Sequence, residues 1–136
     1  MSSRPPPEPL VLYLDRNLGG RSVAGVLGEA GIPFESHAAH LPHNAPDEEW
    51  IALCARNGWL GVTLDKHIRY RAPEIGAARA HGACVVVIRA KSASGAMNGE
   101  IFRRAYPRLG RFIAAPPPPV FAGVDRAGNI RPYSLD

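Results

Sequence analysis

The stretch Gly58-Trp-Leu-Gly-Val-Thr-Leu-Asp-Lys-His-Ile68 joins an apolar run to a charged segment. Residues 59–64 predict a strand that ends at Asp65. The residues that follow, 66–72, are rich in basic side chains and are interpreted as a loop. Asp65 is therefore expected just beyond the end of a strand.

Three further segments predict strands on either side of this one. Residues 9–14 form a continuous apolar run that ends at Asp15, as is typical of a central strand buried on both faces. Residues 83–88 are the most strongly β-prone run of the chain, and residues 32–36 are expected to form a short strand. Helices are expected at residues 23–30, 47–57, 73–81 and 101–112, the last kinked at Pro107.

The remaining segments complete the organisation of the chain. Residues 37–45 are interpreted as a loop, and residues 92–99 are flexible in composition. Prolines 116–119 predict a stiff spacer, although such a run is also typical of ligands for groove-binding modules. Residues 120–134 predict a hairpin around a turn at 125–129. We expect a tail at 1–9 and a single domain at 10–136, in which 115–136 hold the spacer and the hairpin.

Strands that alternate with helices imply right-handed crossovers and a mainly parallel sheet. The sequence therefore predicts an α/β fold, a three-layer α/β/α sandwich with a small C-terminal hairpin. Chemistry is expected at the carboxyl ends of the strands, because ligands of open α/β sheets bind in the crevice there.

Composition limits the partners and the location of the chain. The formal net charge of +4 and the pI near 9.5 favour a polyanionic partner, because Lys and Arg gain affinity by displacing counterions from phosphates. No apolar run approaches the length of a membrane span, and the first residues lack the order of a signal peptide, so a cytoplasmic protein is expected. Cys54 and Cys84 lie in apolar segments and are interpreted as buried, reduced thiols.

Three aspartates are the strongest candidates for chemistry. Asp15 and Asp65 each follow a predicted strand, and Asp47 begins a predicted helix, so all three can converge on one edge of the sheet. Carboxylates that crowd together repel one another, and a divalent cation such as Mg²⁺ or Mn²⁺ is the simplest way to keep them ionised. Each aspartate also has an ordinary structural explanation, as a turn residue or a helix cap.

Polar residues beside these aspartates are candidates for contact with a phosphate backbone. Tyr70, within the basic segment, is placed to stack on a base. A plain solvated role explains the charged residues equally well. The candidates for substrate contact are Arg16, Asn17, Lys66, Arg69 and Arg71.

Several other patterns are discounted. His37, His40 and His43 are spaced by three, but Pro42 and the loop composition around them argue against a zinc site. The glycine pairs match neither the dinucleotide fingerprint nor the Walker pattern, so a nucleotide cofactor is not expected. No Ser, Cys or His stands in a recognisable nucleophile motif.

Two further segments carry a family resemblance together with Gly58–Ile68. Leu12-Tyr-Leu-Asp15 and Asp47-Glu-Glu-Trp-Ile-Ala-Leu-Cys-Ala55 resemble the core pattern of PIN-like domains over residues 10–90, especially compact ones related to VapC toxins. The resemblance implies an endoribonuclease that uses Mg²⁺ or Mn²⁺, often the toxin of a toxin–antitoxin pair whose partner protein blocks the acidic site. It implies that Asp15, Asp47 and Asp65 bind the metal and that the hydroxyl of Thr63 supports the site.

The chain departs from the longer family pattern in one respect. The interval between Asp15 and Asp47 is too short for the helical insert that carries another acidic residue, and Glu48, or else Glu49, is the candidate to replace it. The departure leaves open a noncatalytic PIN-like module that binds RNA or an antitoxin. A receiver-like signalling domain is a third reading, but Arg16 stands where a receiver has a second acid. The sequence does not determine whether the chain forms a homodimer.

Overall fold

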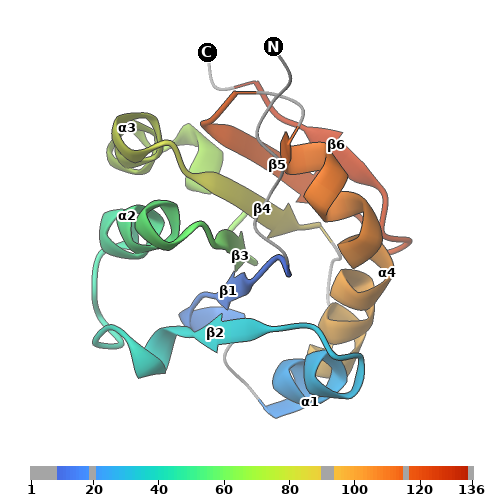
Figure 1. Ribbon diagram of the computed structural model, residues 1–136. Coiled ribbons are helices and arrows are strands. Elements are labelled where there is room, and N and C mark those ends of the chain that lie inside the picture. Colours follow the sequence, from blue (N-terminus) through green and yellow to red (C-terminus); the bar gives the residue numbers. More distant parts are fainter. Residues whose placement is uncertain (1–8, 19–20, 90–93, 115–116, 135–136) are drawn as a thin grey trace.

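The computed structural model describes residues 9–18, 21–89, 94–114 and 117–134. These residues form one six-stranded sheet with helices on both faces (Figure 1). The predicted three-layer α/β/α sandwich is therefore confirmed. The strands, in their order across the sheet, are β2 (Phe34–Ser36), β1 (Leu12–Leu14), β3 (Leu60–Thr63), β4 (Cys84–Ile88), β5 (Val120–Val124) and β6 (Ile130–Pro132).

The sheet is parallel from β2 to β5, and β6 pairs antiparallel with β5. The last pairing confirms the C-terminal hairpin. The chain moves from β1 to one neighbour, β2, and then crosses to the other neighbour, β3. Ligands of such sheets bind where the strand order reverses, which here is at the carboxyl ends of β1 and β3.

Four helices cover the two faces. Helices α1 (Arg21–Glu29) and α4 (Gly95–Ala114) pack on one face, and α2 (Asp47–Asn57) and α3 (Ala72–His81) pack on the other (Figure 1). Successive residues of a strand point to opposite faces. Leu12 and Leu14 accordingly join the core under α1 and α4, whereas Tyr13 joins the core under α2 and α3. Burial on both faces explains why β1 reads as a continuous apolar run.

Helix α4 begins earlier than predicted. The hydroxyl of Ser94 accepts the N–H of Met97 at 3.1 Å, so Ser94 caps the helix start. A Cβ at Gly99 would lie 2.8 Å from Cβ of Val26 in α1, so this glycine permits close helix packing. The interpretation of 94–99 as flexible was therefore wrong, and residues 92–93 lie outside the described residues. The helix is continuous through Pro107.

Smaller differences concern segment ends and loops. Strand β1 begins at Leu12, later than predicted, and short 3-10 turns occupy η1 (Arg16–Leu18), η2 (His37–Ala39) and η3 (Ile68–Tyr70). Cys54 is buried and Cys84 is partly buried, and both are free thiols. None of the helices in the described ranges is both long and apolar enough to cross a membrane.

Candidate active site

A hollow of about 390 Å³ lies beyond the carboxyl ends of β1 and β3. The three predicted aspartates all line it, together with Arg16 and Asn17. The rest of its wall comes from residues 44–46, which lead into α2. Side chains that are far apart in the sequence therefore meet at one edge of the sheet, as the positions after the strands predicted.

Asp15 is the most buried of the three, with 3% of its surface exposed. Thr63, at the end of β3, donates its hydroxyl to Oδ2 of Asp15, and the N–H of Asn17 donates to Oδ1 at 2.9 Å. Burial raises the pKa of Asp15 and the charge of Asp47 adds to that rise, whereas the two hydrogen bonds oppose it. Two hydrogen bonds thus hold the carboxyl group in a buried position, where a nearby cation would stabilise its charged form.

Thr63 also organises the second strand end. Its Oγ1 accepts the backbone N–H of Asp65 at 3.0 Å, so one buried hydroxyl links Asp15 to the turn that carries Asp65. The carboxylate of Asp65 in turn accepts the N–H of His67 at 3.0 Å. The Thr-x-Asp spacing therefore has a physical basis, because the hydroxyl bridges two strand ends and positions both aspartates.

Asp47 reaches the hollow from the first turn of α2. Trp50, one helical turn later, donates Nε1–H to Oδ1 of Asp47 at 2.8 Å. Its indole ring is fully buried and stacks on Tyr13 of β1, with ring centroids 5.8 Å apart. Arg16 Nη2 donates to the same Oδ1 at 3.3 Å. Packing against β1 therefore fixes the distance of Asp47 from Asp15.

Arg71 lies among the acids rather than free in solution. Its Nη1 contacts Oδ2 of Asp65 and lies 3.9 Å from Oδ2 of Asp47 and 3.8 Å from Oε2 of Glu74. The hydrogen bond to Asp65 is the main reason that the pKa of Arg71 is raised. Arg71 was predicted to contact substrate, and in the structure it balances the charge of these carboxylates.

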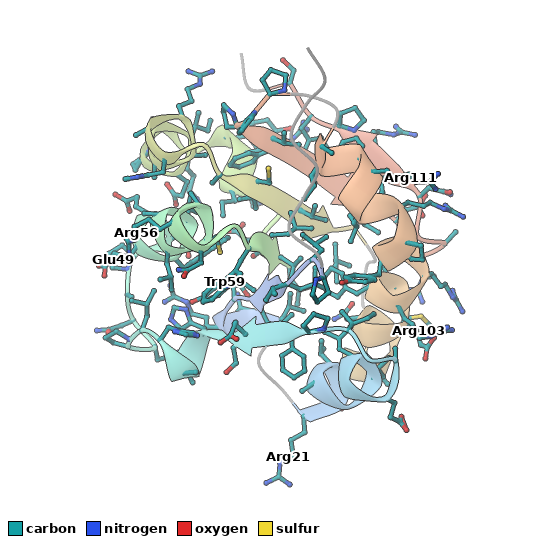
Figure 2. The ribbon with its side chains drawn as sticks, in the orientation of Figure 1. Arg21, Glu49, Arg56, Trp59, Arg103 and Arg111 are labelled. Atoms are coloured by element: carbon teal, nitrogen blue, oxygen red, sulfur yellow. The ribbon has the colours of Figure 1, made fainter. Side chains whose placement is uncertain are left out.

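Glu74 is an acidic residue at this site that sequence reasoning missed. It is 7% exposed, and burial raises its pKa, with the charge of Asp47 adding to the rise. Glu48, the residue favoured to replace the missing acid, is exposed, and Figure 2 shows Glu49 at the outer surface. The available signal was the position of Glu74 in the first turn of α3, directly after the loop that carries Asp65.

The other two predicted substrate contacts lie outside the hollow. Lys66 is exposed. The guanidinium of Arg69 lies over the ring of Tyr70, 4.4 Å from its centroid, and over the ring of Tyr133, 3.9 Å from its centroid. Arg69 therefore links η3 to the segment that follows β6.

The donor atoms of the site fit a hard divalent cation. Asp15, Asp47 and Asp65 offer carboxylate oxygens, which are the ligands that Mg²⁺ and Mn²⁺ favour. Within the described ranges no three Asp, Glu, His or Cys side chains already stand close enough to form a metal site. Instead, guanidinium groups occupy the carboxylate oxygens, because Arg71 bridges Asp65 and Asp47 and Arg16 bonds to Asp47. A bound cation would replace guanidinium charge as the partner of these oxygens.

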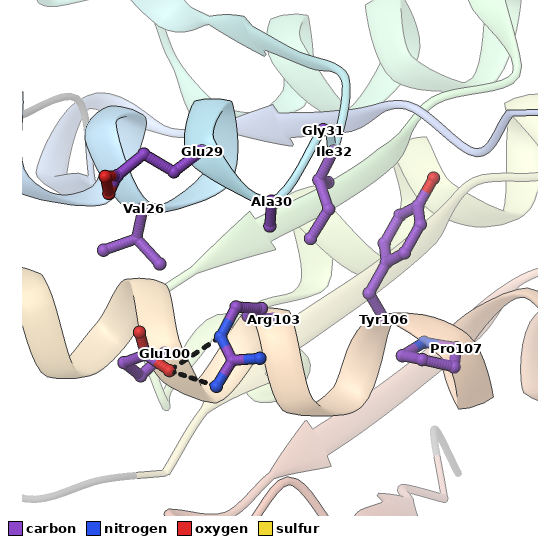
Figure 3. A pocket seen from close by; sticks show the side chains of 9 residues that line it. All are labelled: Val26, Glu29, Ala30, Gly31, Ile32, Glu100, Arg103, Tyr106 and Pro107. Atoms are coloured by element: carbon purple, nitrogen blue, oxygen red, sulfur yellow. Dashed lines mark hydrogen bonds and ion pairs between the residues drawn. The ribbon is translucent and has the colours of Figure 1, made fainter.

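A larger hollow of about 580 Å³ lies between α1 and α4 (Figure 3). It is lined near Gly31 and Ile32, which precede β2, so it lies at the other end of the strands from the three aspartates. Glu100 and Arg103 form an ion pair at 2.7 Å on its wall. The larger hollow is lined by none of the three aspartates, so the smaller acidic hollow remains the candidate active site.

Comparison with known proteins identifies the family of the chain. A family model described as PIN like domain matches residues 10–90. The matched residues run from β1 through β4 and include all three aspartates of the hollow. No curated protein and no solved structure matches the chain.

Proposed function

Because the chain belongs to the PIN-like domain family, whose members are generally nucleases, we propose that it is a metal-dependent endoribonuclease. The observation that carries the proposal is the meeting of Asp15, Asp47 and Asp65 in one hollow, beside two arginines. Carboxylates supply ligands for Mg²⁺ or Mn²⁺, and guanidinium groups supply contacts for phosphate. The combination suits hydrolysis of a phosphodiester bond.

Each residue has a defined task in this chemistry. A divalent ion held by these carboxylates would supply an activated water and would neutralise charge on the leaving oxygen, and the products would carry a 5′-phosphate and a 3′-hydroxyl. Asp15, which is buried and accepts the hydroxyl of Thr63, would hold the ion together with Asp47 at the start of α2 and Asp65 beyond the end of β3. Arg16 lines the hollow and is placed to orient the phosphate.

The test is cleavage of RNA by the wild-type chain beside Asp15→Asn and Asp65→Asn. We expect cleavage with Mg²⁺ or Mn²⁺, none with EDTA, and a loss of at least about a hundredfold in both variants. Asp125→Asn is the matched control, because the same change then falls in the exposed turn between β5 and β6. Full activity in folded Asp65→Asn, or fragments with 3′-phosphate ends, would refute the proposal.

A second candidate is a noncatalytic PIN-like module that binds RNA. The observation that favours it is the pairing of Arg71 with Asp65, Asp47 and Glu74, which neutralises the carboxylates without a metal. Tight RNA binding with no cleavage over a range of Mg²⁺ and Mn²⁺ concentrations would select this alternative. Cleavage that depends on Asp15 and Asp65 would exclude it.

We further propose a biological role of the VapC type, in which an antitoxin protein covers the acidic hollow in the cytoplasm. The support is the sequence resemblance over residues 10–90, together with a site that opens at the molecular surface. Expression of the chain alone should arrest growth, and Asp65→Asn should not. Normal growth with active, well-expressed protein would refute the toxin role and leave the nuclease proposal intact.

A further inference from the structure

A second hollow, of about 440 Å³, lies beside the acidic one. Arg16 lines both hollows and so forms the wall that they share. The rest of the second hollow is formed by residues from Ser36 to His43, which run from the end of β2 towards α2. A nucleotide chain with a phosphate at the aspartates would therefore have this hollow beside it.

Hydrogen bonds through His37 hold this wall in place. The carbonyl of Pro42 can only accept, so Nε2 of His37 carries a proton and donates to it at 2.8 Å. In the uncharged ring, Nδ1 then accepts the O–H of Tyr13 at 2.8 Å. Tyr13 is fully buried and stacks on Trp50, which itself donates to Asp47. The hollow is therefore built on the same rigid cluster as the acidic site.

The lining of the hollow suits a flat ring with a polar edge. Ala38, Leu41 and Pro42 present apolar surface, which can cover the face of a nucleobase. Ser36 and His43 add a hydroxyl and an imidazole at the rim, which can bond to exocyclic and ring atoms of a base. Pockets of this kind, mostly apolar with a few polar groups, are typical of small-ligand sites.

Arg16 supplies the connection between the two hollows. Its Nη2 donates to the carbonyl of Ala45 and to Asp47, and these contacts keep the guanidinium in place. Among the described residues, Nε and Nη1 of Arg16 have no hydrogen-bond partner. These N–H groups can bond to the edge of a base or to the phosphate that joins it to the next nucleotide.

We propose that this second hollow, here called the base pocket, binds the unpaired nucleobase next to the phosphodiester bond at the aspartates. The inference rests on the proposed nuclease function and deepens it. A base that is paired and stacked in a duplex cannot enter a pocket, whereas a base in a single strand can be splayed out. The base pocket therefore determines which unpaired base the enzyme prefers beside the cleaved bond.

The first test is titration of the full chain with adenosine 5′-monophosphate and with ribose 5-phosphate, in the presence of Mn²⁺. We expect the nucleotide to bind about tenfold tighter or more, because only the nucleotide has a base to stack. Ala38→Trp should fill the pocket and remove this difference. Ala127→Trp is the control, since Ala127 is also exposed but lies in the turn at the opposite edge of the sheet.

His43→Trp is a second variant that fills the base pocket, for use if Ala38→Trp does not fold. Circular dichroism reports whether each variant is folded. Equal binding of the two ligands by the wild type would overturn the proposal. It would also fall if both filled variants, when folded, kept the base-dependent difference.

An RNA cleavage assay distinguishes failure of the base pocket from failure of the proposed nuclease function. RNA cut at unchanged positions and rates by Ala38→Trp would leave the nuclease standing and remove the base pocket. Base-dependent binding without any cleavage would keep the pocket and remove the nuclease. The expected result is cleavage of single-stranded RNA by the wild type, with a lower rate or altered cut sites in Ala38→Trp.

Discussion

The environment of Asp15 shows how one buried hydroxyl organises the site. Thr63 is fully buried, donates to Asp15 and accepts from the N–H of Asp65. Asp15 has its pKa raised by burial, so the carboxylate depends on these few donors for its remaining solvation. Thr63 is therefore expected to contribute both to the free energy of unfolding and to the affinity of the site for a metal ion.

Replacement of Thr63 by Val keeps the shape of the side chain and removes the hydroxyl. Asp15 then loses a donor and the N–H of Asp65 loses an acceptor, so we expect a loss of about 1–3 kcal/mol of unfolding free energy. Urea denaturation measures the change. Thr63→Ser keeps the hydroxyl and should recover most of the difference, and equal stability of the Val variant and the wild type would contradict this account.

The positions of the aspartates were predictable at the residue scale, but the neighbours of each were not. Asp15 and Asp65 follow apolar runs, so their place beyond the strand ends follows from the sequence pattern. The contact of Arg71 with Asp65 depends on the shape of the segment 66–72, which carries no repeating pattern. Glu74 was missed for the same reason, because an acid in a first turn is common and only the fold shows that this one is buried.

At the scale of elements, the contact between α2 and β3 determines where Asp47 lies. A Cβ at Gly61 of β3 would lie 2.5 Å from Cζ3 of Trp50, so the indole ring packs directly on the strand backbone. Trp50 also bonds to Asp47. The absence of a side chain at position 61 thus sets the distance of α2 from the sheet, and with it the position of a site carboxylate.

Gly61→Ala should displace Trp50 and cost about 1–3 kcal/mol of stability, as overpacking of a core does. Gly25→Ala is the matched control, because nothing lies within 4 Å of its added Cβ and the residue is exposed in α1. The control should gain up to about 1 kcal/mol, since alanine favours a helix over glycine. Thermal unfolding of both variants measures the two effects, and shifts of the same sign and size would contradict the packing argument.

The hairpin turn is a second element whose stability can be tested. The carboxylate of Asp125 accepts the N–H groups of Ala127 at 3.0 Å and Asn129 at 2.9 Å. Hydrogen bonding by Asn129 is the main cause of the lowered pKa of Asp125. The contribution of the turn to stability is therefore present above the ordinary value of 3.8, and it is lost as pH falls through the lowered pKa of the folded state.

Asp125→Ala should accordingly lower the midpoint of thermal unfolding at neutral pH. The difference from the wild type should shrink as the pH falls from 3.8 through the lowered pKa of the folded state, below which the carboxylate is protonated in both states. Unfolding scans between pH 7 and pH 3 follow the change. A difference that stays constant, or that grows towards acid pH, would show that the carboxylate does not stabilise the turn.

Element types could be predicted from periodicity, whereas some boundaries could not. Gly58 and Gly82 end α2 and α3 with positive φ values of 71° and 73°, and such glycines are readable in the sequence. The start of α4 was not readable, because Gly95 and Gly99 look like loop residues. Their small size serves the close approach of α1, which is a tertiary contact.

At the scale of the whole molecule, the topology explains why residues 15, 47 and 65 meet. Parallel strands place all their carboxyl ends on one edge, and the reversal of strand order at β1 and β3 opens the crevice there. The positive charge of the molecule is not confined to the surroundings of the acidic hollow. Arg103 and Arg111 are exposed side chains of α4 (Figure 2), and neither lines the acidic hollow, so the net charge by itself does not mark the nucleic-acid surface.

The central claim is that three aspartates in one hollow bind a divalent cation. Calorimetric titration of the wild-type chain with Mn²⁺ tests it most directly, beside Asp15→Asn, Asp65→Asn and the control Asp125→Asn. The account predicts saturable binding by the wild type and the control, and affinity at least about tenfold weaker in the two site variants. Equal Mn²⁺ affinity in the wild type and both site variants, or no binding by the wild type, would contradict it.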